Sequence, residues 1–237
     1  MASPHPSLQD EASIVYRSQC VIALLCLAPP IATADVLIDQ IGPNDGSALA
    51  GDTYGSQSFL PVSELTADLA AIENMTLLGK SHLDAVEFVL DGWYYFDGPE
   101  HIVSWEVNIY SDFEAATTNL VGDILSHTAV PTFDPQWTGD GWLVRLPIDV
   151  LLSSGEYFFG VLMTNPYPDN GWAGVATSTL GDASAWQVAP EGEGVYVFAP
   201  AIETSDNLAY RVLGTQVPTP ATLAVLLLAN FRSRRRR

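Results

Sequence analysis

The middle of the chain alternates between apolar and polar residues with the two-residue period of a β-strand. The clearest example is the segment 103–110, in which the intervening polar residues are Ser104, Glu106 and Asn108. Successive side chains of a strand point to opposite faces, so this pattern predicts one face toward a core and one toward solvent. The predicted inward residues are Val103, Trp105, Val107 and Ile109.

Similar short β-prone runs recur along the chain. The other expected strands cover residues 35–41, 83–90, 142–148, 157–163, 184–188, 194–198 and 208–213. Turn dipeptides lie between several of them, at Asp91-Gly92, Asp97-Gly98, Asp140-Gly141 and Asn170-Gly171. The segment 157–163 is apolar on both faces, which predicts a central strand. About nine or ten short strands predict an all-β fold, a single antiparallel β-sandwich resembling a jelly roll, over residues 35–214.

One segment has helical spacing instead. Ser63 is a suitable N-cap, and Leu65, Leu69 and Ile72 recur on one face of a helix over residues 63–74. We therefore expect one short helix in a domain otherwise made of strands.

The N-terminal residues have the pattern of a secretory signal peptide. An apolar run at 21–28 is followed by two prolines and then by Ala32-Thr33-Ala34. Signal peptidase cleaves after a small-X-small sequence of this kind, so we expect cleavage between Ala34 and Asp35. Residues 1–34 would then be removed, and the mature protein would be exported.

The C-terminal residues 215–237 combine a proline turn, a short apolar run and an arginine cluster. The turn is Val217, Pro218, Thr219 and Pro220, and the apolar run covers 221–231. Positive charge beside an apolar segment resists translocation and stays on the cytoplasmic side of the membrane. The basic residues at the end of the chain are Arg232, Arg234, Arg235, Arg236 and Arg237.

This tail resembles the PEP-CTERM sorting signal of exported bacterial proteins, with Thr219 in place of the usual acidic residue. The resemblance implies recognition by an exosortase-like transpeptidase and transient insertion of the apolar run into the inner membrane. It also implies a final location at the cell surface or outside the cell. The middle of the chain loosely resembles exported β-sandwich domains of unknown function, on motifs that include Gly92-Trp93, Asn165-Pro166 and Gly171-Trp172.

The charge of the mature domain restricts its partners. Between residues 35 and 217 there are 26 acidic side chains and only three basic ones, Lys80, Arg145 and Arg211, which gives a formal net charge of −23. Such a surface repels nucleic acid and anionic lipid, and it suits a soluble extracellular protein. Both cysteines precede residue 35, so no disulfide is expected in the mature domain.

No pattern in the sequence predicts catalysis. A glycosidase needs two facing carboxylates, and no spacing singles out a pair among Glu73, Glu87, Glu106 and Glu114. No Gly-X-Ser-X-Gly elbow accompanies His82, His101 or His127. His82 and Asp84 would offer two zinc ligands without a third. We therefore predict no catalytic residues and a protein that is not an enzyme.

Calcium is the one cofactor that the sequence suggests. Oxygen ligands from acidic loops suit Ca²⁺, although Asp and Asn before Gly are also ordinary turn residues. No loop has the spacing of an EF-hand. The candidate ligands are Asp45, Asp134, Asp140 and Asp169.

Aromatic residues beside turns point to carbohydrate. Their rings stack on sugar faces, and in a β-sandwich they also fill the core, so both interpretations stay open. The four residues 93–96 are all aromatic, and strand alternation cannot bury all of them on one side. The candidate glycan-binding residues are Trp93, Tyr94, Trp137 and Trp172.

Together these patterns predict an exported cell-surface or matrix protein with a structural or adhesive role and no catalysis. A carbohydrate-binding module, with or without structural calcium, is the alternative. The expected partners are signal peptidase, the exosortase-like transpeptidase and extracellular polysaccharide.

Overall fold

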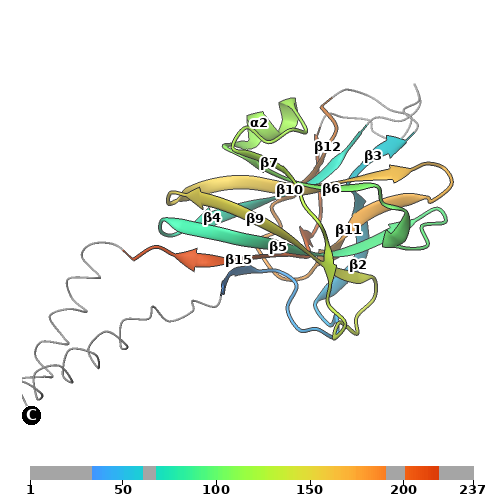
Figure 1. The fold of residues 1–237 in the computed structure, drawn as a ribbon, viewed down its shortest axis with the longest axis horizontal. Helices are drawn as coiled ribbons and strands as arrows, with labels where there is room; N and C mark the ends of the chain where they lie inside the picture. Colours follow the sequence, from blue (N-terminus) through green and yellow to red (C-terminus); the bar gives the residue numbers. More distant parts are fainter. Residues whose placement is uncertain (1–33, 61–67, 191–200, 219–237) are drawn as a thin grey trace, which may run out of the picture. The chain divides into compact units, whose positions relative to one another are not determined.

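Two β-sheets pack face to face in the computed structural model, which describes residues 34–60, 68–190 and 201–218 (Figure 1). The prediction of an all-β sandwich is therefore confirmed. Several predictions concern residues outside these ranges: the signal peptide up to Thr33, the expected strand at 194–198, and the tail residues Thr219, Pro220, Arg234, Arg235, Arg236 and Arg237.

The first sheet has eight strands and is centred on the long strand β5 (Ser81–Trp93). Along one edge β5 pairs antiparallel with β9 (Trp142–Leu152), and along the other with β15 and then β11. The remaining strands of this sheet are β1 (Asp35–Asp39), β2 (Leu49–Gly55), β8 (Thr132–Phe133), β11 (Trp172–Ser178), β14 (Asn207–Leu208) and β15 (Tyr210–Gln216).

The second sheet has seven strands and is centred on β10 (Gly155–Pro166). β10 pairs antiparallel with β6 (Ser104–Tyr110) on one edge and with β4 (Ala70–Leu77) on the other, where β3 continues the edge in a parallel pairing. The predicted central strand is thus confirmed. The other elements are β3 (Gln57–Leu60), β7 (Leu125–Thr128), β12 (Ala185–Val188), β13 (Ala201–Glu203), the short helix α2 (Phe113–Thr118) and the 3-10 turn η2 (Pro99–His101).

The core lies between the sheets and follows the two-residue period. Trp105, Val107 and Ile109 of β6 are buried in it, as predicted, together with Val86, Phe88 and Leu90 of β5. Val103 is a correction, because it precedes β6 and is 66% exposed. Asn108 is buried, and its Oδ1 accepts a hydrogen bond of 2.9 Å from the backbone N–H of Gly122.

The predicted helix is wrong in the part that the structure describes. Residues 70–77 form β4, which pairs with β10 on one side and β12 on the other. Residues 70–73 are all buried, and an apolar run covered on both faces has no clear period of its own. Pairing with two neighbours therefore decided the structure of this segment.

The predicted turn at Asp91-Gly92 is also wrong, because both residues lie inside β5. Gly92 pairs with Ala173 of β11, and a β-carbon at Gly92 would overlap the Trp172 carbonyl and the Phe96 ring. The glycine thus permits a close approach of two strands. This approach brings the ends of β5 and β11 together.

Candidate functional site

A pocket lined by aromatic residues lies where β5 ends and β11 begins. Trp93 and Trp172 are opposite each other in the register of these strands, and β10 ends beside them in the turn 167–170. The pocket has a volume of about 170 Å³. It is called the tyrosine pocket below, and its lining residues are Tyr94, Tyr95, Tyr167, Pro168 and Trp172.

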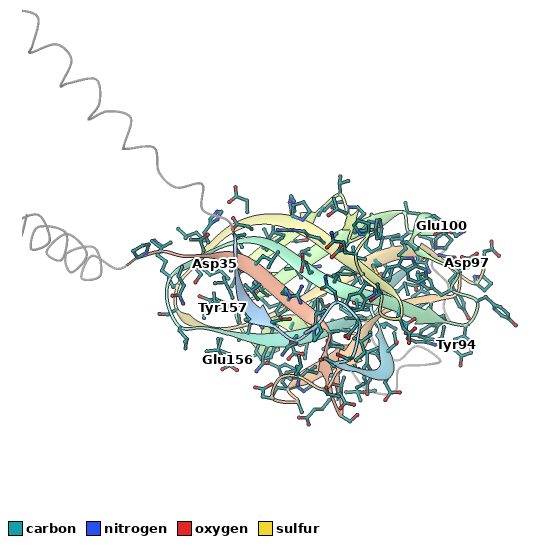
Figure 2. All side chains as sticks on the ribbon, turned by 90° about the horizontal axis from the view of Figure 1, so that it is seen from below. Asp35, Tyr94, Asp97, Glu100, Glu156 and Tyr157 are labelled. Carbon is teal, nitrogen blue, oxygen red and sulfur yellow. The ribbon has the colours of Figure 1, made fainter. Side chains whose placement is uncertain are left out.

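Two of the lining rings are largely in solvent. Tyr94 is 62% exposed and Tyr95 is 90% exposed. Within the residues that the structure describes, neither phenol hydroxyl makes a hydrogen bond to the protein. Figure 2 shows Tyr94 at the same end of the sandwich as Asp97 and Glu100, far from Asp35, Glu156 and Tyr157. These two rings are therefore available to a ligand.

The base of the pocket is packed. Trp172 is only 6% exposed, and its ring centroid lies 5.4 Å from that of Trp93 and 5.1 Å from that of Phe59. Tyr167 contacts both Phe59 and Trp172 edge-on, at 5.4 and 6.1 Å. Such aromatic contacts favour one arrangement of the rings. The floor is thus held in place by a small core of its own.

The backbone at the rim is strained. Tyr94 and Tyr95 have φ angles of 53° and 74°, in the left-handed region that bulky side chains avoid. Each such residue costs about 1–2 kcal/mol. The Phe96 N–H donates to the Trp93 carbonyl across this bend, and a β-carbon at Gly171 would overlap the Tyr94 carbonyl. Strained residues of this kind cluster at functional sites.

Buried amides hold the opposite rim. The Asn170 amide donates to Asn165 Oδ1 at 2.6 Å, and the Asn165 amide donates to the Gly171 carbonyl at 3.2 Å. Gln57 Oε1 accepts from the backbone N–H of Ala173 at 2.6 Å. All three side chains are buried. Together they fix the turn 167–170, which carries Tyr167 and Pro168.

The structure brings together three of the four predicted glycan-binding residues. Tyr94 and Trp172 line the pocket, and Trp93 packs behind them with its ring 6.5 Å from that of Tyr94. Trp137 is elsewhere, in the loop before β9, where its indole N–H donates to the Asp140 carbonyl at 3.2 Å. Sequence reasoning did not select Tyr95 or Tyr167. The signal for Tyr95 was the run of four aromatic residues at 93–96.

The calcium candidates are only partly brought together. Asp45 and Asp140 line a second pocket, of about 290 Å³, with Asp52 and Asp91. Asp134 and Asp169 do not line it; Asp134 accepts from the Gln136 N–H in a turn. Among the described residues, no group of three or more His, Cys, Asp or Glu side chains is arranged to hold a metal ion.

The second pocket is called the acidic pocket below, and local hydrogen bonds explain the positions of two of its carboxylates. Asp45 bonds to Ser47, whose side chain and backbone lower the pKa of the Asp45 carboxyl. Asp91 Oδ2 accepts from the Thr53 hydroxyl at 2.7 Å. The turn interpretation of Asp45 is thus supported by its contacts.

Three of the four carboxylates considered for catalysis have structural partners, and Glu114 is exposed on α2. Glu73 is buried in the core and accepts from the Leu208 N–H at 2.9 Å; desolvation raises the pKa of its carboxyl to about 8. Glu87 pairs with Arg211 at 3.0 Å. Glu106 accepts from the Ser126 hydroxyl at 2.6 Å. These contacts anchor strands to one another.

His82 is held between two carboxylates on the outer face of the first sheet. Its Nδ1 lies 2.8 Å from Asp84 and its Nε2 lies 2.7 Å from Asp149. The hydrogen bond with Asp149 is the largest factor that raises the pKa of this imidazole, and Asp84 adds to it. The arrangement is a surface ion-pair cluster that links β5 to β9.

Comparison with protein-family models gives no match, and comparison with curated proteins finds no similar sequence. In the described ranges, no helix has both the length and the apolar character needed to cross a membrane. The geometry of the site is therefore the basis for assigning a function.

Proposed function

We propose that this chain is an exported, non-catalytic surface protein that holds an extracellular glycan in the tyrosine pocket. The observation that carries the proposal is the exposure of Tyr94 and Tyr95 on strained backbone, beside the packed ring of Trp172. The adhesive role expected from the sequence and the carbohydrate-binding alternative become one function in this account.

The chemistry of the pocket suits a sugar. The C–H face of a pyranose stacks on an aromatic ring, and the phenol hydroxyls can exchange hydrogen bonds with sugar hydroxyls. Binding sites for small molecules commonly combine an apolar lining with a few polar groups. Tyr94, Tyr95 and Tyr167 supply both from the same side chains.

Core filling explains the buried rings but not the exposed ones. Trp172 packs against Phe59 and Trp93, so its position is accounted for by the fold. Tyr95, in contrast, buries only a tenth of its surface and occupies a backbone conformation that costs about 1–2 kcal/mol. A ligand that contacts the exposed ring gives this residue a function.

The contacts of the first and last strands support processing of the chain at both ends and delivery to the cell surface. Asp35, the first residue after the expected cleavage, begins β1 and pairs with Gly214 of β15. The Val217 N–H donates to the Lys80 carbonyl at 2.8 Å, directly before the proline turn of the expected sorting signal. Removal of both signals would thus leave these terminal strands whole.

Calorimetric titration of the exported protein with a panel of soluble oligosaccharides tests the proposal. We expect at least one to bind, and Tyr95→Ala to weaken that binding about tenfold through loss of a stacking ring. Leu78→Ala is the matched control, because Leu78 is 88% exposed and lies in the turn before the other end of β5. Absence of binding across the panel, or equal loss in both variants, would contradict the proposal.

A further inference from the structure

We infer that the tyrosine pocket selects glycans that carry free amino groups, such as glucosamine polymers, over neutral and acidic glycans. The inference rests on the proposed function and names the ligand class of the same site. It follows from the distribution of charge along β5 and from the orientation of the rings.

The two arginines of the domain pair with carboxylates and lie far from the tyrosine pocket. Arg211 pairs with Asp39 and with Glu87, each at 3.0 Å, and Arg145 lies 3.8 Å from Glu87. Glu87 is six residues before Trp93 on the same strand. At the usual rise per residue, the two arginines are about 20 Å from the start of the pocket along β5.

Lys80 is still farther away. It directly precedes β5, so about 40 Å of strand separates it from Trp93. Screening in physiological salt reduces the effect of a charge over a distance of about 8 Å. None of the three basic side chains therefore offsets negative charge at the tyrosine pocket.

The acidic side chains nearest in sequence to the pocket are exposed and follow lining residues closely along the chain. Asp97 is two residues after Tyr95, and Asp169 directly follows Pro168. Glu100 lies at the same end of the sandwich as Tyr94 and Asp97 (Figure 2). The Nε2 atom of His101 lies 3.6 Å from Asp97 Oδ1. A cationic ligand would thus enter a negative field, whereas a uronic acid would be repelled.

The rings form walls at steep angles. The plane of Trp172 is inclined by 62° to Tyr94 and by 80° to Tyr167. A flat platform would bind one sugar face only, whereas rings at steep angles can surround a compact group. The negative faces of aromatic rings attract an ammonium group, with more effect when the group is partly desolvated. A protonated amino sugar offers both a ring to stack and a cation to enclose.

Titration with three hexasaccharides tests the inference: β-1,4-linked glucosamine, its fully N-acetylated form, and galacturonate. We expect glucosamine to bind about tenfold more tightly than the N-acetylated form, with the advantage falling at high salt. Galacturonate should bind most weakly. Tyr95→Ala should weaken binding of the first two.

Two double variants test which carboxylates cause the preference for glucosamine. Asp97→Asn combined with Asp169→Asn should reduce the glucosamine preference about threefold to fivefold, as expected for two exposed charges. Asp35→Asn combined with Glu156→Gln removes the same charge at the opposite end (Figure 2) and should leave the preference unchanged. Thermal unfolding of both double variants checks that the fold is intact.

The outcomes distinguish the amino-sugar inference from the proposed binding of glycans in general. Equal affinity for glucosamine and its N-acetylated form would overturn the amino-sugar inference and leave glycan binding standing. An equal loss in both double variants would overturn it too, because attraction would then come from the net charge alone. If neither of these sugars nor any other in the panel binds, the proposed function itself fails.

Discussion

The two ends of strand β5 differ in how their polar and aromatic groups are used. At the Ser81 end, His82 bonds to Asp84 and Asp149, and the Lys80 carbonyl accepts from Val217. At the Trp93 end, the strand runs into two strained and exposed tyrosines. The contacts at the first end account for its residues within the fold, whereas those at the second leave the exposed ring of Tyr95 without a structural role. An exposed group with a conformational cost and no structural role is therefore the better indicator of function.

The largest effect should come from the floor of the tyrosine pocket. Phe59 is 1% exposed and contacts both Tyr167 and Trp172. Phe59→Ala should lower the free energy of unfolding by about 3–5 kcal/mol, because it leaves a cavity in a packed cluster. Urea denaturation measures this change, and Tyr95→Ala, which removes a ring from the rim, should alter stability far less. A similar loss in both variants would show that the rim is structural.

Glu73 should make the stability of the whole sandwich depend on pH. Desolvation raises the pKa of its carboxyl to about 8 in the folded protein, above its ordinary value of 4.5. The unfolded chain therefore ionises at Glu73 first, so the contribution of Glu73 to stability is highest below about pH 4.5, falls as pH rises toward 8, and then levels off. The change should be on the order of a few kcal/mol.

Glu73→Gln tests this pH dependence, because glutamine keeps an acceptor for the Leu208 N–H but does not ionise. The difference in unfolding free energy between the two proteins should grow between pH 4.5 and 8. A difference that stays constant over that range would contradict the assignment. The other carboxylates are the same in both proteins, so their titration cancels.

Tyr95→Asn should separate stability from binding at the exposed end of β5. Asparagine adopts left-handed backbone more readily than tyrosine, so the variant should be more stable by about 0.5–1 kcal/mol. Its affinity for the glycan should fall about tenfold. Thermal unfolding and titration on the same samples measure both quantities. Loss of stability would mean that the exposed ring supports the fold.

The smallest effect should come from the other end. The carboxylates of Asp149 and Asp84 raise the pKa of His82, so its ion pairs stabilise the fold below pH 6.5 and lose that contribution as pH rises through the folded pKa. Because the cluster is exposed, His82→Asn should cost only a few tenths of a kcal/mol at pH 5.5 and less at pH 9. Glycan affinity should not change; a change would link the two ends.

The fold could be predicted from the sequence where one face of a strand is buried. The alternation around Trp105 fixed β6, and the apolar run at 157–163 correctly indicated a central strand. The prediction failed at β4, which is buried on both faces and so has no clear period, and at Gly92, where close strand pairing was mistaken for a turn. In both cases the deciding partner is distant in sequence.

The candidate site could be predicted in part for the same reason. The aromatic run at 93–96 indicated that some rings must be exposed, and Trp172 was selected as a neighbour of a turn. Only the pairing of β5 with β11 shows that these rings meet, and only the end of β10 adds Tyr167. Trp137 has the same residue type and a turn beside it, but its strand pairing places it elsewhere.

A structure of the protein with a bound glucosamine oligosaccharide would be the decisive test of where the glycan binds. We predict a sugar ring against Tyr95, with its amino group enclosed by the rings of Tyr94, Tyr167 and Trp172. A sugar bound only in the acidic pocket beside Asp45 and Asp140, or only at Trp137, would contradict it.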